Sequence, residues 1–196
     1  MAVSESFPQR FEKVFPRQAP FNTPRYTHFA RSLFSNLLGG IGYFHGTSVV
    51  DRTYAPEYEE EDEGFWEDAL AAQTRPGAAN FEGPTELFTS IPSRPFFPRG
   101  FLWDEGFHLV PISEWDMDLT LEIVKSWLSL VDEDGWIPRE QILGDEARSK
   151  VPQEFQTQYP HYANPPTIFF ILTKFIDKLE EVQAQGGDSS EYIRPR

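Results

Sequence analysis

Apolar residues recur at helical spacing in three stretches of the chain. A helix is predicted over residues 26–38, because apolar side chains recur at four-residue steps until Gly39-Gly40 ends the pattern. A second helix is predicted over residues 118–131, with Asp118 as its cap. A third is predicted over residues 165–185, with two prolines in its first turn and an apolar surface on almost every side near its start. The pattern therefore predicts a mainly helical chain.

Prolines and glycines interrupt this pattern. Residues 1–24 hold four prolines among four phenylalanines, which favours an extended strap whose rings insert into a neighbouring surface. Residues 41–50 fit either a short strand or an aromatic-lined loop. Seven prolines or glycines between residues 75 and 99 predict a long loop, and such loops inside compact domains are usually functional. Residues 186–196 are expected to form a flexible or divergent tail.

Composition narrows the possible functions. The 196 residues include 39% hydrophobic and 15% aromatic residues, which is enough for a core and for exposed rings on which sugars stack. A net charge of −14 disfavours binding to a phosphate backbone, so nucleic acid is not expected as a partner. The absence of cysteine excludes disulfides and thiolate chemistry. The chain has no basic leader before an apolar run and no apolar stretch of about 18 residues, so neither a targeting segment nor a membrane segment is expected in it.

An acidic run lies between residues 57 and 68. Eight of these residues are Asp or Glu, and such a run usually forms solvated surface. The alternative is a contact to a metal ion or to sugar hydroxyls, although the spacing does not match a calcium-binding EF-hand loop.

The densest candidate for chemistry is the segment 93–108. Asp104 stands between Trp103 and Glu105, and glycines bracket the acidic pair. A carboxyl group held against aromatic surface, with a like charge beside it, is disfavoured in its ionised form and can donate a proton near neutral pH. The alternative is that Asp104 caps a helix beginning at Glu105.

A second candidate segment spans residues 134–152. It combines an indole with charged side chains: Trp136, Arg139, Glu140, Asp145, Glu146 and Arg148. Such clusters bind polyhydroxylated ligands, because charged groups bind paired hydroxyls while the indole covers a ring face. The alternative is a solvated loop with salt bridges inside the chain. A third cluster, residues 159–166, could form a pocket wall or simply end a loop.

Four segments together resemble a known family. Residues 35–47, 93–108, 139–148 and 163–166 are closely similar to glycoside hydrolases of family 63, the processing α-glucosidases, and the acidic run is similar to the fungal form. The resemblance extends from about residue 25 to about residue 178.

The resemblance implies a fold, an activity and a site. The fold would be part of an (α/α)₆ toroid over residues 25–185, with long functional loops. The activity would be removal, with inversion, of the terminal α-1,2-linked glucose from the glucosylated high-mannose N-glycan precursor in the endoplasmic reticulum, with neither metal nor other cofactor. Asp104 would be the general acid. The residues expected around the glucose are Arg99, Trp103, Glu105, Phe107, His108, Trp136, Arg139, Glu140, Asp145, Glu146 and Arg148.

The chain also departs from the family pattern. Complete members have a β-sandwich domain and a membrane anchor before this region and the remaining toroid after it. Inversion needs a second carboxylate about 6.5–9.5 Å from the first, and the family's base lies downstream of the matched segments. We therefore expect an incomplete form that is inactive alone. The alternative is an inactive fragment that only binds glycan or a partner chain.

Overall fold

The computed structural model describes residues 6–53 and 79–186. The acidic run at 57–68 and the predicted tail beyond residue 186 lie outside these ranges. The helices are α1 (Phe7–Val14), α2 (Pro24–Gly39), α4 (Leu102–Trp115), α5 (Met117–Leu128), α6 (Gly144–Arg148) and α7 (Phe169–Ala184), with a 3₁₀ turn at Gln153–Phe155. The strands are β1 (Ile41–Val50), β2 (Asn80–Ser90), β3 (Gly100–Phe101), β4 (Glu140–Gln141) and β5 (Thr157–Gln158). Helices outweigh strands in the described part, as the pattern predicted.

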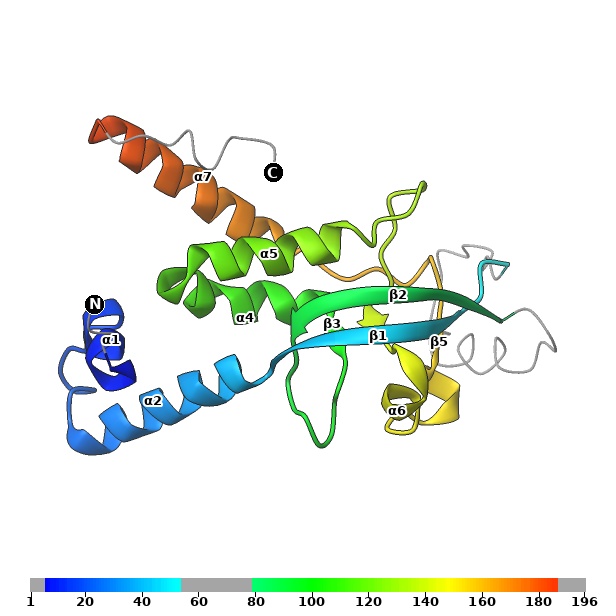
Figure 1. Cartoon of the computed structure of the whole chain (residues 1–196), viewed down its shortest axis with the longest axis horizontal. Coiled ribbons are helices and arrows are strands. Elements are labelled where there is room, and N and C mark those ends of the chain that lie inside the picture. Colours follow the sequence, from blue (N-terminus) through cyan, green and yellow to red (C-terminus); the bar gives the residue numbers. More distant parts are fainter. Residues whose placement is uncertain (1–5, 54–78, 187–196) are drawn as a thin grey trace, which may run out of the picture.

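A long hairpin of β1 and β2 runs through the molecule (Figure 1). The two strands pair antiparallel from Ile41 opposite Ser90 to Val50 opposite Asn80, and β5 joins the other side of β1 in parallel. Residues 41–50 are therefore a strand, one of the two predicted alternatives. The prediction of a loop throughout 75–99 is wrong for β2.

The reason is that β2 accommodates its glycine and proline at a bulge. Gly83 and Pro84 together lie opposite Thr47, where the register shifts. Gly83 has a φ of +99°, which glycine adopts without a Cβ penalty. Because β2 is an edge strand, a proline without an N–H group is tolerated there.

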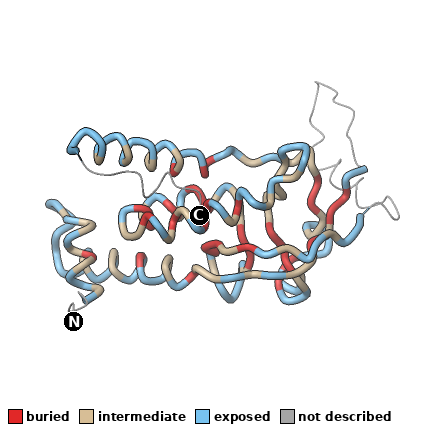
Figure 2. Tube along the Cα trace, turned by 45° about the horizontal axis from the view of Figure 1, so that its top comes forward, coloured by how far each residue is buried: buried red, intermediate tan, exposed pale blue. Residues whose placement is uncertain are grey.

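The main core lies where helices cover the end of this hairpin. α4 packs against α5, α7 and α2, and α5 packs against β2 (Figure 1). The buried residues of this core are Leu87, Leu109, Ile112, Ile123, Val124, Trp127, Leu143, Ile168 and Ile171. Figure 2 shows this buried centre, whereas the outer parts of α2 and α7 are mostly exposed. Within residues 6–53 and 79–186, no helix is long and apolar enough to span a membrane.

The N-terminal segment differs from the predicted extended strap, because part of it is helical. Residues 7–14 form α1, which begins with a capping box between Ser6 and Gln9. Pro8 is compatible with this helix because the first turn needs no N–H donor at that position. The rings of α1 pack around Phe34 and Trp115.

Two predicted helix boundaries also shift. α5 is capped by Asp116, whose carboxylate accepts a hydrogen bond from Leu119 N at 3.0 Å, so the cap lies two residues before Asp118. Asp116 is the better cap because its backbone is extended, as an N-cap requires. α7 begins at Phe169, because Pro165 and Pro166 form turns instead of its first helical turn.

Candidate active site

Asp104 lies in the first turn of α4. The short β3–β4 pair leads directly into this helix, and Leu102 N donates a hydrogen bond to Arg139 O at 2.9 Å. The N-cap is Phe101, whose backbone is extended, so α4 begins before Glu105. The alternative role of Asp104 as a helix cap is therefore wrong. Its half-buried side chain stands on the helix next to two exposed aromatic rings.

Those rings are Trp103 and Phe107, which are 47% and 54% exposed. Their centroids lie 6.4 Å apart, one helical turn from each other. Thr167 Oγ1 donates a hydrogen bond to Trp103 O at 2.6 Å. Gly106 permits this approach, because a Cβ there would lie 2.5 Å from Thr167 Cβ. The aromatic surface beside Asp104 is thus held in place by the segment before α7 and can stack on a sugar ring.

Glu105 points the other way, into the core. Its side chain is 0% exposed, and one carboxyl oxygen accepts hydrogen bonds from Thr89 Oγ1 at 2.7 Å and Ser90 Oγ at 3.2 Å. The other oxygen accepts a bond from Ser90 N at 3.3 Å. Trp127 Nε1 donates in turn to Thr89 Oγ1 at 3.1 Å. Glu105 was expected around the glucose, but this burial leaves it no surface with which to touch a sugar.

Burial raises the pKa of Glu105 to about 7, and the hydrogen bonds from Thr89, Ser90 and Trp127 oppose that rise. From the sequence, a carboxyl group that is disfavoured in its ionised form was predicted in the acidic pair, and it was assigned to Asp104. The structure places it on the neighbouring residue, because successive helical positions face in different directions.

His108 connects this buried group to the surface. Its Nδ1 lies 2.7 Å from Ser90 Oγ and 4.0 Å from a Glu105 carboxyl oxygen. Burial lowers the pKa of His108, while the charge of Asp104, one helical turn earlier, acts in the opposite direction. The imidazole is therefore mostly uncharged at neutral pH and lies close enough to Asp104 to sense its charge.

Arg99 and Glu140 form an ion pair beneath the start of α4. Arg99 is 6% exposed, and its Nε donates to a Glu140 carboxylate oxygen at 2.8 Å. Its guanidinium also lies 4.7 Å from the Phe101 ring centroid. Arg139 stacks on Tyr162, 5.5 Å from the ring centroid. Both residues of the ion pair were expected around the glucose, but in this structure they bind each other and fasten β3 to β4.

The α6 residues form a different group. Asp145 and Glu146 are exposed and, with Tyr43, His45 and Arg94, line a hollow of about 460 Å³. Arg148 donates hydrogen bonds to Thr47 O and to Asp145. It therefore anchors α6 to β1. Asp104 does not line this hollow, so the structure does not place the α6 acids beside the candidate general acid.

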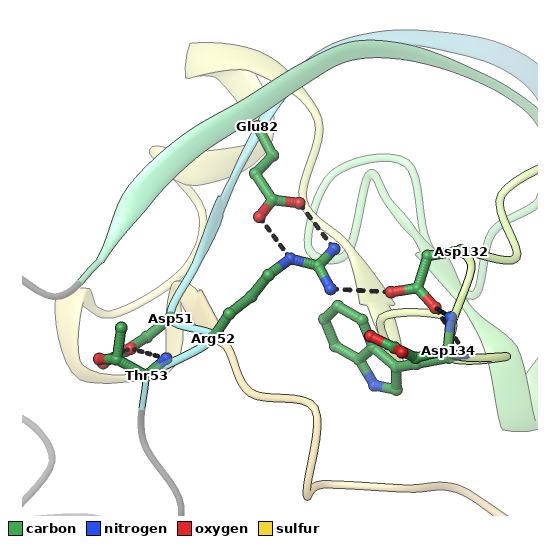
Figure 3. Close-up of polar contacts among 7 residues, drawn as sticks. Asp51, Arg52, Thr53, Glu82, Asp132 and Asp134 are labelled. Carbon is green, nitrogen blue, oxygen red and sulfur yellow. Dashed lines mark hydrogen bonds and ion pairs between the residues drawn. The ribbon is translucent and has the colours of Figure 1, made fainter.

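Trp136 belongs to yet another group, on the loop between α5 and β4. Arg52 donates two hydrogen bonds to Glu82, at 2.7 and 3.0 Å, and one to Asp132 at 2.8 Å (Figure 3). The guanidinium lies 5.2 Å from the Trp136 ring centroid, and Trp136 N donates to Asp132. The hydrogen bond from Arg52 lowers the pKa of Asp132. This cluster ties the far end of the hairpin to the loop, through ion pairs of residues that precede the segment 134–152. Within that segment, the ion pair is the one between Arg148 and Asp145.

Sequence reasoning missed the residues that hold α4 from behind. Thr89 and Ser90 end β2 and bind Glu105, while Thr167 binds the Trp103 carbonyl. Two hydroxyl residues directly after Leu87 and Phe88 were a usable signal, but the surrounding prolines and glycines concealed the strand. Within the part of the chain that the structure describes, no three acidic or histidine side chains are arranged to hold a metal ion.

Comparison of the sequence with known protein families identifies the family of the chain. The profile of the Glycosyl hydrolase family 63 C-terminal domain matches residues 1–194. The chain therefore belongs to glycoside hydrolase family 63. This agrees with the resemblance seen in the four sequence segments.

Individual relatives carry more specific names. The chain is 48% identical over 196 residues to a "Probable mannosyl-oligosaccharide glucosidase" of Schizosaccharomyces pombe, covering 96% of this chain and 24% of that protein. It is 53% identical over 167 residues to the mannosyl-oligosaccharide glucosidase of Saccharomyces cerevisiae, covering 84% and 19%. The Arabidopsis thaliana relative named mannosyl-oligosaccharide glucosidase GCS1 is 48% identical over 166 residues, covering 83% and 17%. The chain thus spans no more than a quarter of the length of these relatives.

Proposed function

We propose that this chain supplies the general acid of a mannosyl-oligosaccharide glucosidase. The substrate would be the glucosylated high-mannose N-glycan precursor in the endoplasmic reticulum, from which the terminal α-1,2-linked glucose is removed. The observation that carries the proposal is Asp104 in the first turn of α4, beside the exposed rings of Trp103 and Phe107. The names of the relatives support the substrate class.

In the proposed reaction, Asp104 donates its proton to the glycosidic oxygen as the bond from that oxygen to the anomeric carbon breaks. A water molecule attacks the opposite face of the sugar, gives its proton to a second carboxylate and leaves β-glucose. Such acid catalysis contributes about 10²–10⁴-fold. The second carboxylate must stand about 6.5–9.5 Å from Asp104 to leave room for that water. We assign it to a part of the enzyme outside the described residues.

The fold that would assemble this site is an (α/α)₆ toroid, of which α2, α4, α5 and α7 would form part. The exposed apolar side chains on the outer helices support this arrangement. Phe29 and Leu33 on α2, and Phe169, Phe170 and Ile176 on α7, are all more than half exposed. Further helices of a toroid would cover them, since exposed apolar faces of this kind mark interaction surfaces.

The test is a chimera of the S. pombe relative in which this chain replaces the segment it matches. Asp104→Asn should lower glucose release from a glucosylated high-mannose oligosaccharide by about 10²-fold or more, while an iminosugar still binds. Asp177→Asn, an exposed aspartate on α7, is the matched control and should act like the parent. Proton NMR of the first product should show β-glucose. Activity of Asp104→Asn within about threefold of the parent would remove Asp104 from the mechanism.

The exposed apolar faces of α2 and α7 also favour a second candidate, a module that binds glycan or a partner chain without hydrolysis. The same chimera separates the two. If the parent chimera binds the oligosaccharide but releases no glucose, the binding module is the better description.

A further inference from the structure

Glu105 occupies a position that the proposed reaction does not explain. A fully buried carboxyl group is costly unless its hydrogen bonds are satisfied, and an apolar residue would fill the same space without that cost. Both of its oxygens are bonded to β2, through Thr89 Oγ1, Ser90 Oγ and Ser90 N. The carboxyl group therefore joins the first turn of α4 to the end of β2, directly behind Asp104.

Two other contacts hold the same turn. Leu102 N bonds to Arg139 O, and Trp103 O accepts from Thr167 Oγ1. With Glu105 these contacts fasten three of the first four residues of α4 to three separate segments, and Asp104 lies between two of them in sequence. Because an acid must stand within hydrogen-bond reach of the leaving oxygen, a displacement of about 1 Å can cost up to about 10²-fold in rate.

The hydrogen-bond chain also reaches His108. Each hydroxyl has one proton to give, so when Glu105 is ionised, Ser90 donates to it and accepts from the His108 Nδ1–H. When Glu105 is protonated, the Ser90 proton is free to turn toward Nδ1, which leaves the imidazole proton on Nε2. The state of Glu105 thereby selects the tautomer of an imidazole one helical turn from Asp104.

We propose that Glu105 is a positioning residue for Asp104, which fixes the first turn of α4 against β2 and, through Ser90, sets the tautomer of His108. This inference rests on the proposed role of Asp104 as general acid. In the described part of the chain, the groups facing Glu105 are Thr89 and Ser90 from β2, Trp127 from α5, and His108 from its own helix. His108 is therefore the titratable group that faces Glu105, and Asp104 is the residue whose position Glu105 would fix.

The test measures kcat and KM across about pH 5 to 9 in the same chimera. Glu105→Gln keeps the size of the side chain but removes its titration, and Ser90→Ala removes the link to His108. Each should lower kcat by about tenfold or more with KM changed less than about twofold, because bound substrate is unaffected but the acid is misplaced. The parent should show a change in kcat near pH 7, where Glu105 titrates, and Glu105→Gln should remove that change. Ser113→Ala, a buried serine of α4 that bonds to Val110 O, is the matched control and should act like the parent.

The outcomes are distinct. If Glu105→Gln and Ser90→Ala lower the melting temperature but keep kcat within about twofold of the parent at every pH, Glu105 is only structural and the inference fails. If Asp104→Asn keeps full activity, the proposed function fails instead. Should Glu105→Gln not fold, Ser90→Ala decides, together with ¹⁵N NMR of His108. At the upper end of this pH range, where Glu105 is ionised, the parent should hold the imidazole proton on Nδ1 and Ser90→Ala should not. The same tautomer in both proteins at that pH would overturn the link.

Discussion

Replacing Gly106 by alanine should destabilise the chain by driving α4 away from the segment before α7. The added Cβ would lie 2.5 Å from Thr167 Cβ and would also meet the Thr167 carbonyl carbon and Oγ1. Backbone atoms cannot move aside as a flexible side chain can. Overpacking of this kind costs typically about 1–3 kcal/mol, and alanine returns about 0.5–1 kcal/mol through its higher helix propensity.

The net loss is therefore about 2 kcal/mol, since contact with backbone places this site at the upper end of the range. For a chain of this size the melting temperature should fall by about 4–8 °C. Thermal unfolding followed by circular dichroism measures it. Gly39→Ala is the matched control, because a Cβ at the end of α2 meets nothing within 4 Å, and it should melt at the parent temperature or slightly above.

A double-mutant cycle with Thr167→Gly tests the cause. Removing the Thr167 side chain takes away two of the three clashing atoms. The double variant should therefore lose less stability than the sum of the losses in the two single variants. If Gly106→Ala melts at or above the parent temperature, the close packing of α4 on residue 167 is not what holds this turn.

Three further predictions follow from the same site. Burial raises the pKa of Glu105 from 4.5 to about 7. Its contribution to stability is therefore fully present below about pH 4.5 and is lost as the pH rises to about 7, because Glu105 ionises at a lower pH in the unfolded chain than in the folded one. Urea titrations should show that the parent loses about 3 kcal/mol of unfolding free energy over this pH window and that Glu105→Gln does not. The same dependence of the unfolding free energy on pH in both proteins would contradict the prediction. In the chimera, Trp103→Ala should weaken binding of a glucose-mimicking iminosugar, whereas Trp136→Ala should lower the melting temperature and leave binding by the folded fraction unchanged; the reverse pattern would move the sugar site to the α5–β4 loop. The chain alone should release no glucose from a glucosylated oligosaccharide, and catalytic release of β-glucose would show that its own acids supply the base.

Several features of the candidate site were predictable from the sequence. The aromatic and acidic residues around Asp104 lie within one turn of a helix, so their proximity follows from their spacing alone. Glycine at position 106 was visible too, although not its reason, because Thr167 lies far along the chain. The direction of each acid was not predictable. Asp104 and Glu105 are adjacent in sequence, and the burial of one of them depends on a strand that ends at residue 90.

Local signals also explain which elements were predicted correctly. The helical spacing at residues 26–38 needs no partner to be visible, and α2 covers it. By contrast, β2 contains a Gly-Pro pair that favours a loop, and it forms a strand because β1 lies beside it and a bulge absorbs the extra residue. α1, like β2, depends on distant segments, since its rings pack against Phe34 and Trp115 from other helices.

The sequence by itself determined the family, the mainly helical composition and the residue that stands as candidate acid, because these depend on local spacing and on motifs. Tertiary structure alone decided which charged residues are available to a ligand. Arg99 is buried and paired with the partly buried Glu140, Arg148 anchors α6, and Glu105 supports α4 from within. Charge and polarity can be read from a residue's identity, but the groups that desolvate or neutralise it come from distant segments, so they appear only once the chain has folded.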